Sequence, residues 1–220
     1  MGHEGYIHPR LVLLAGAAGC VDAASFLGLQ EVFTANQTGN TVLIGIALGR
    51  GEWAAFGRCG TAIGGFCVGV ALAALAQRGG GRGWSGRVTG VLVAEAVLLA
   101  ATAALWAPLG AIGLIGLTAA AMGMQSAAAL HVAVPGVTTT FITGSFTRVA
   151  TGLVTRGRAE ATPAASVLLY VAGAFAGAWL SRDLSEATGL VVGAAVVAVA
   201  VAPWPGRLRR RPSRRAAAPR

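Results

Sequence analysis

Charged residues are scarce in this sequence of 220 residues. They make up only 11% of it, whereas 55% of the residues are hydrophobic and the mean hydropathy is +0.69. A soluble domain carries about 25% charged residues, so this chain has too little charge to cover a globule in water. Disorder, a nucleic-acid-binding domain and almost any soluble enzyme are therefore excluded. The composition indicates a single all-α, polytopic membrane helix bundle in a lipid bilayer.

Residues that bind metals or act as nucleophile and base are also few. The three cysteines, Cys20, Cys59 and Cys67, form no Cys-x-x-Cys pair, and His131 is the only histidine after the first ten residues. Metal sites and nucleophile–base pairs need such residues at defined spacings. We therefore expect no metal, no cofactor and no enzymatic activity.

Lysine is absent, and the basic residues are all arginines. Seven of them follow Pro205: Arg207, Arg209, Arg210, Arg211, Arg214, Arg215 and Arg220. Such a run beyond a span is typical of a cytoplasmic tail on anionic lipid, at about 1 kcal/mol per basic residue. Nucleic acid is not an expected partner. The predicted organisation is a cytoplasmic N-terminus (1–10), one transmembrane domain (11–204) and a cytoplasmic tail (205–220).

Six apolar runs are long enough to span a bilayer. They are 11–29, 56–76, 88–107, 110–130, 164–181 and 187–203. Two further stretches, 32–49 and 132–154, are interrupted by polar residues or proline. A helix of about 12 residues reaches only about 18 Å, against a hydrocarbon core of about 30 Å. These two stretches are expected to form half-helices or poor full spans.

The two interrupted stretches resemble each other. Thr38-Gly39-Asn40 matches Thr143-Gly144-Ser145, which predicts an internal duplication with halves at about 11–107 and 110–203. If neither stretch crosses the bilayer, six spans form a 3+3 inverted repeat. If both cross, eight spans form a 4+4 parallel repeat. With six spans, seven of the arginines outside the tail lie on the cytoplasmic side and three on the outer side. With eight spans the division is five to four, and Arg148 lies inside the membrane. The positive-inside rule therefore favours six.

Small residues recur at the spacing that lets membrane helices approach closely. Examples are Gly60-x-x-x-Gly64, Gly65-x-x-x-Gly69 and Gly173-x-x-x-Gly177. These faces predict tight helix packing and also offer a surface for a homo-oligomer.

Two acids, Asp22 and Glu95, lie near the middle of predicted spans. An ionisable group at that depth costs about 2.5–3.5 kcal/mol on insertion scales, so it needs a partner, water or a proton. Arg148 is the expected partner. One interpretation is an ion pair that fixes helix register, and the other is a solute or proton site facing a cavity.

The Thr-Gly steps predict a polar centre. Helices that begin at mid-depth present free N–H groups and a positive dipole end to the midplane, as in transporters with inverted repeats. The alternative is that the polar groups only cap helix ends. The candidate substrate-binding residues are Asp22, Asn36, Thr38, Gly39, Asn40, Thr41, Glu95, Gln125, Thr143, Gly144, Ser145 and Arg148.

Two linked motifs identify a resemblance. Gly19-Cys20-Val21-Asp22-Ala23 precedes Phe33-Thr34-Ala35-Asn36-Gln37-Thr38-Gly39-Asn40-Thr41, and Gly123-Met124-Gln125-Ser126-Ala127 precedes Thr143-Gly144-Ser145-Phe146-Thr147-Arg148. Over residues 10–204 the chain resembles the YoaK-like family of bacterial inner-membrane proteins, a domain of unknown function. The resemblance implies a multi-pass protein of the inner membrane with six spans, and it implies no substrate.

Together these features favour a transporter or channel for an unknown small solute or ion. A non-transporting scaffold or assembly protein is the alternative, and an intramembrane enzyme is a weaker one. Substrate charge and proton coupling stay open at this point.

Overall fold

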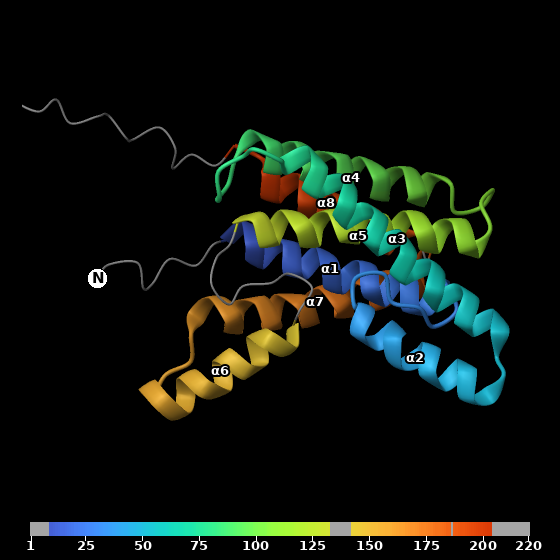
Figure 1. Cartoon of the computed structure of the whole chain (residues 1–220), viewed down its shortest axis with the longest axis horizontal. Helices are drawn as coiled ribbons and strands as arrows, with labels where there is room; N and C mark the ends of the chain where they lie inside the picture. The colour runs from blue at the N-terminus through green and yellow to red at the C-terminus, as the bar shows by residue number, and fades with distance from the viewer. Residues whose placement is uncertain (1–8, 133–141, 186, 204–220) are drawn as a thin grey trace, which may run out of the picture.

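The computed structural model describes residues 9–132, 142–185 and 187–203, and every regular element within them is an α-helix (Figure 1). The helices are α1 (Pro9–Gly28), α2 (Gln37–Arg50), α3 (Trp53–Gln77), α4 (Gly86–Ala104), α5 (Ala111–Val132), α6 (Ile142–Arg156), α7 (Ala161–Asp183) and α8 (Thr188–Val201). The arginine-rich tail, and with it the predicted contact with anionic lipid, lies outside the described residues.

Five of these helices are long and apolar enough to cross a bilayer, namely α1, α3, α4, α5 and α7. They coincide with five of the six predicted spans to within a few residues. Helix α8 is equally apolar but has only 14 residues, or about 21 Å at 1.5 Å per residue. The helical membrane bundle is thus confirmed, whereas the count of six full spans stays a prediction.

The two interrupted stretches both form short helices, α2 with 14 residues and α6 with 15. Helix α2 begins one residue before Thr38-Gly39, and α6 begins one residue before Thr143-Gly144. In Figure 1 the starts of both helices point towards the middle of the bundle's long axis. Their lengths and starting points follow the sequence prediction.

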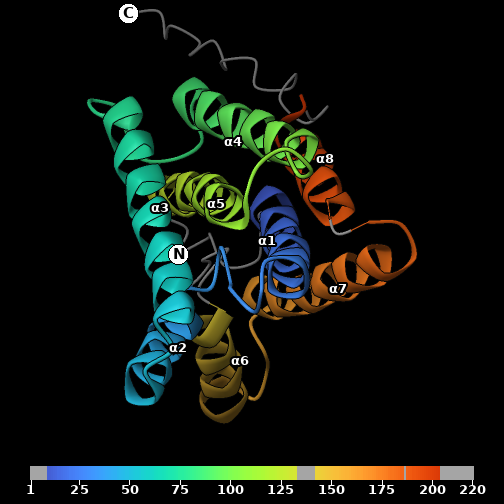
Figure 2. The same ribbon diagram turned by 90° about the vertical axis from the view of Figure 1, so that its right-hand side faces the viewer.

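Helices α1 and α5 form the centre of the bundle. They run in opposite directions in Figure 1, and in both views α4 and α8 lie on one side of them while α2 and α6 lie on the other (Figure 2). Helix α1 packs against α7 and α8, and α5 packs against α3 and α4. Helices α2 and α6 contact α3 and α7, respectively.

Glycine permits the closest of these contacts. A Cβ atom at Gly173 of α7 would lie 2.0 Å from the carbonyl oxygen of Gly16 in α1, and one at Gly69 of α3 would lie 1.9 Å from that of Ala120 in α5. No larger residue fits at such distances, so the backbones of the α1–α7 and α3–α5 pairs touch. A Cβ at Gly60 or Gly64, by contrast, would meet no atom within 4 Å.

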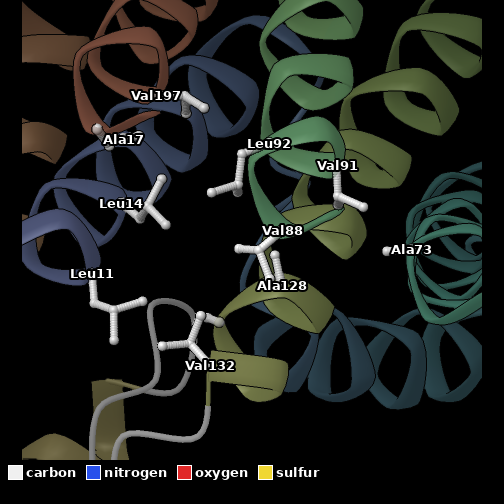
Figure 3. Packing of buried hydrophobic residues seen from close by; sticks show 12 residues of the cluster. Leu11, Leu14, Ala17, Ala73, Val88, Val91, Leu92, Ala128, Val132 and Val197 are labelled. Carbon is white, nitrogen blue, oxygen red and sulfur yellow. The ribbon is translucent and has the colours of Figure 1, made fainter. Parts of the chain in front are cut away.

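The apolar core lies where α1, α4, α5 and α8 meet (Figure 3). Leu14, Leu92, Ala128 and Val197 are buried there, one from each helix. Outward-facing side chains are also large and apolar. On α7 alone these include Leu168, Phe175 and Trp179. A bundle that is apolar inside and outside is what a lipid solvent requires.

Candidate functional site

A buried polar cluster forms around the carboxylate of Asp22 in α1. Its Oδ1 accepts hydrogen bonds from the backbone N–H groups of Thr34, Ala35 and Asn36 at 3.0, 2.7 and 3.4 Å. Its Oδ2 accepts a bond of 2.7 Å from the hydroxyl of Tyr170 in α7. One side chain that is only 2% exposed thus ties the segment between α1 and α2 to both α1 and α7.

The geometry of that segment follows from its first residues. Gln30 and Glu31 adopt φ angles of 60° and 63°, a region that non-glycine residues rarely occupy. The chain reverses there and returns along α1, where the Thr34 hydroxyl donates a 3.3 Å bond to Ser25 Oγ. Because the chain doubles back, its backbone N–H groups reach Asp22.

The amides of the Asn-Gln-Thr-Gly-Asn motif stabilise the start of α2. Asn40 is buried; its Oδ1 accepts from the N–H of Phe33 at 3.1 Å, and its Nδ2 donates to the Phe33 carbonyl at 2.6 Å and to Gln37 Oε1 at 2.8 Å. Asn36 Oδ1 caps the helix by accepting from the N–H of Gly39 at 3.3 Å. These amides therefore hold irregular backbone in place, as the capping alternative predicts.

Most threonines of the two motifs lie at the surface of the chain, although Thr34 is buried. Thr38, Thr41 and Thr143 are exposed, together with Gly144. The Thr41 hydroxyl donates a 2.9 Å bond to the Gln37 carbonyl within its own helix. Ser145 is also buried, and its hydroxyl has no described partner.

The predicted partnership of Arg148 with a mid-span acid is wrong. Arg148 binds Glu160, which precedes α7, through Nη2 at 2.6 Å and Nε at 3.1 Å. Arg156 donates to the other carboxylate oxygen of Glu160. Hydrogen bonds from Arg156, and to a smaller extent from Arg148, hold the pKa of Glu160 below its ordinary value. Arg148 lies only 12 residues before Glu160. The ion pair is therefore local in the sequence and joins α6 to the residue that precedes α7.

Glu95 and Gln125 also lie outside the Asp22 cluster. Both are fully buried, Glu95 on α4 and Gln125 on α5. Gln125 donates a 3.0 Å bond from Nε2 to the carbonyl of Leu14 in α1. Helix α4 is on the opposite side of the central helices from α2 (Figures 1 and 2), and α6 contacts only α7 among the described helices. The predicted residues therefore lie in three separate parts of the bundle (around Asp22, between α4 and α5, and on α6) and do not form one polar centre.

A groove of about 330 Å³ lies beside the Asp22 cluster, between α1, α7 and the returning segment, which is residues 29–36 between α1 and α2. Asp22 and Tyr170 line it together with Phe26 and Phe33, whose rings stack at 4.8 Å. Its walls are apolar, with one acid–phenol pair among them. The groove surface stays apolar, because the Asp22 carboxylate and the Tyr170 hydroxyl bind each other and the backbone.

Sequence reasoning missed Tyr170. The signal was present, because it is one of only two tyrosines and lies inside an apolar span, where a hydroxyl needs a partner. The Thr34 and Phe33 backbone groups could not have been found, since they depend on the chain reversal at Gln30. Within the described ranges, no group of three or more potential metal ligands occurs.

The fold and these polar clusters define a class: a polytopic α-helical membrane protein whose described residues form five long apolar helices and three shorter ones. The chain belongs to the family described as "Protein of unknown function (DUF1275)", which matches residues 10–202. This agrees with the resemblance found in the sequence motifs.

A curated relative is "UPF0700 transmembrane protein YoaK" from Bacillus subtilis (strain 168). It is 36% identical over 146 residues, a match that spans 64% of this chain and 64% of the relative. No solved structure matches the chain significantly.

Proposed function

We propose that the chain is a transporter or channel for a small solute or ion, rather than an enzyme, and that its route passes the starts of α2 and α6. The proposed binding groups are Thr38, Gly39 and Thr41 from the first half, and Thr143, Gly144 and Ser145 from the second. Asp22, Asn36 and Asn40 would hold the start of α2 in position. The proposal depends on one observation, namely that the segment between α1 and α2 returns along α1 to reach Asp22.

Irregular backbone is tolerated at membrane depth only where it is buried in protein or lines water. The segment before α2 is irregular, and it returns along a long apolar helix to reach Asp22. The exposed Thr38, Thr41 and Thr143 would supply hydroxyls to a passing solute.

The helix contacts support an inverted 3+3 repeat of α1–α4 and α5–α8. The pairs α1–α7, α1–α8 and α6–α7 correspond to α5–α3, α5–α4 and α2–α3 when the halves are exchanged. Helices α1 and α5 run in opposite directions (Figure 1). Inverted repeats of this kind place their sites where broken helices meet near the midplane.

The arginines support an orientation with the start of α1 in the cytoplasm of a bacterial inner membrane. Arg10 lies over the Trp84 ring at 4.5 Å, so the start of α1 and the 78–85 connection share one end of the bundle. Arg78 and Arg82 lie in that connection, and Arg87 lies in the first turn of α4. The positive-inside rule places this end in the cytoplasm, with the 205–220 tail on the same side.

The proposal is tested by flux into proteoliposomes that contain the full-length chain. A panel of small neutral, anionic and cationic solutes is assayed for wild type, Thr38→Trp and Thr143→Trp. Both residues are exposed, so the variants are expected to fold and to obstruct the route. We expect flux of at least one solute above empty liposomes and its loss in both variants.

Phe175→Trp on the outer face of α7, where Phe175 is 71% exposed, is the matched control and should conduct like wild type. Flux that persists in both threonine variants would place the route elsewhere. A folded wild type that moves none of the solutes would favour the non-transporting scaffold instead.

A further inference from the structure

The core between α4 and α5 contains three buried acceptor oxygens without a donor. Glu95 is fully buried, and neither of its carboxylate oxygens has a hydrogen-bond partner. Gln125 is equally buried, and its Oε1 also has none, although its Nε2 donates to Leu14. Buried polar groups are almost always hydrogen-bonded, so this place lacks a donor.

Glu95 and Gln125 lie between the same two apolar clusters. Helices α4 and α5 form an antiparallel hairpin: Leu92 and Ala128 belong to one cluster, and Leu99 and Ala121 belong to the next. Glu95 lies between Leu92 and Leu99 on α4, and Gln125 lies between Ala121 and Ala128 on α5. Figure 3 shows the neighbouring layer, with Val88 and Leu92 of α4 beside Ala128 of α5.

The charged residues of the described helices that pack on α4 and α5 are engaged or lie elsewhere. On α3, Arg58 lies beside Gly110 at the end where α5 begins, and on α4 Arg87 binds the Arg78 carbonyl. Helix α8 contains no titratable residue, and His131 lies at the far end of α5, 3.1 Å from the Gly81 carbonyl. On α1, Arg10 stacks on Trp84, Cys20 donates to the Gly189 carbonyl and Asp22 binds the returning segment. A carboxylate at Glu95 would therefore stand without a cation or a donor among apolar neighbours.

We propose that Glu95 and Gln125 form a proton-binding site, in which protonated Glu95 donates its O–H to Gln125 Oε1. A single proton neutralises the buried Glu95 carboxylate and also supplies the hydrogen-bond donor that the Gln125 oxygen lacks. On release, the O–H bond of Glu95 breaks, the proton passes to water and the carboxylate keeps the electron pair. The reverse step restores the hydrogen bond.

The site deepens the proposed transport function, on which its role in coupling rests. Release of the proton leaves a bare charge in the core, so it requires water to enter between α4 and the central helices. Such an opening differs from the closed packing described here, and proton release is thereby linked to a change of helix packing. The solute route beside α2 and the proton site beside α8 lie on opposite sides of α1 and α5. These two central helices would therefore link proton release to solute movement, so that a proton gradient drives solute flux.

The proton is detected without transport by infrared difference spectroscopy of the purified full-length chain. We expect a protonated-carboxyl C=O band at neutral pH that disappears in Glu95→Gln and persists in Asp22→Asn. Gln125→Leu should shift the band, because it removes the acceptor. A band that is absent from wild type, that survives Glu95→Gln, or that Na⁺ abolishes would overturn the proposal.

Coupling is then tested by flux under a pH gradient. An acid-outside gradient should accelerate the wild type several-fold relative to its own flux without a gradient, whereas Glu95→Gln should show no acceleration relative to its own. Equal acceleration of both proteins would refute the coupling role. If no solute moves in wild type, the proposed function fails while the infrared result still decides the proton site.

Discussion

The Asp22 cluster makes the sharpest prediction for stability. Asp22→Ala removes the acceptor of four hydrogen bonds, three from backbone N–H groups and one from the Tyr170 hydroxyl. Each buried donor left without an acceptor costs about 1–3 kcal/mol. Even at the lower value, the variant should lose about 4 kcal/mol of unfolding free energy.

Two matched variants show how much of this loss in unfolding free energy comes from the Tyr170 bond and how much comes from the three backbone bonds. Tyr170→Phe removes one of the four bonds and leaves no buried donor behind, so it should cost about 1 kcal/mol. Asp22→Asn keeps an oxygen for the backbone N–H groups and should fall between the two. The order of stability is therefore Tyr170→Phe, Asp22→Asn and Asp22→Ala, from most to least stable.

The measurement is equilibrium unfolding by denaturing detergent in mixed micelles, followed by circular dichroism. An Asp22→Ala variant that is no less stable than Tyr170→Phe would refute the reasoning, because the three backbone bonds would then contribute nothing.

Three further predictions concern other parts of the chain. Gly69→Ala should destabilise by about 1–3 kcal/mol through overpacking, while Gly64→Ala, which meets open space, should not; thermal unfolding in detergent distinguishes them. Asn40→Leu should destabilise by about 1–3 kcal/mol and Thr41→Val by much less in the same assay, because only Asn40 bridges two segments. Glu160 has a lowered pKa, so its arginine pairs stabilise fully above its ordinary pKa of 4.5 and less as the pH falls through the lower value. Glu160→Gln should therefore lower stability at pH 7 by less than about 1 kcal/mol and leave it unchanged at strongly acidic pH; equal effects at both values would contradict this.

Much of the fold was predictable from the sequence because lipid imposes simple rules. Long apolar runs gave rise to α1, α3, α4, α5 and α7 near the predicted bounds. The Thr-Gly steps marked the starts of α2 and α6, since polar residues that can cap a helix precede or begin both.

The side-chain partners were less predictable. Asp22 and Glu95 have similar depths in their spans, but depth does not indicate on which side of a helix a residue lies relative to its neighbours. Arg148 was assigned to them because it is a cation in an apolar stretch, whereas Glu160 satisfies it at the start of the next helix. The chain reversal at Gln30 decides what Asp22 binds, and positive φ angles at non-glycine residues have no sequence signal.

The central claim is that α2 and α6 start at mid-depth and present their polar ends to water. Its most direct test is labelling of Thr38→Cys and Thr143→Cys with a small water-soluble thiol reagent in a chain whose own cysteines are replaced by alanine. Both positions should react in intact membranes, while Leu168→Cys and Phe175→Cys on the outer face of α7 should not. Threonine positions as inert as the α7 positions would contradict the account.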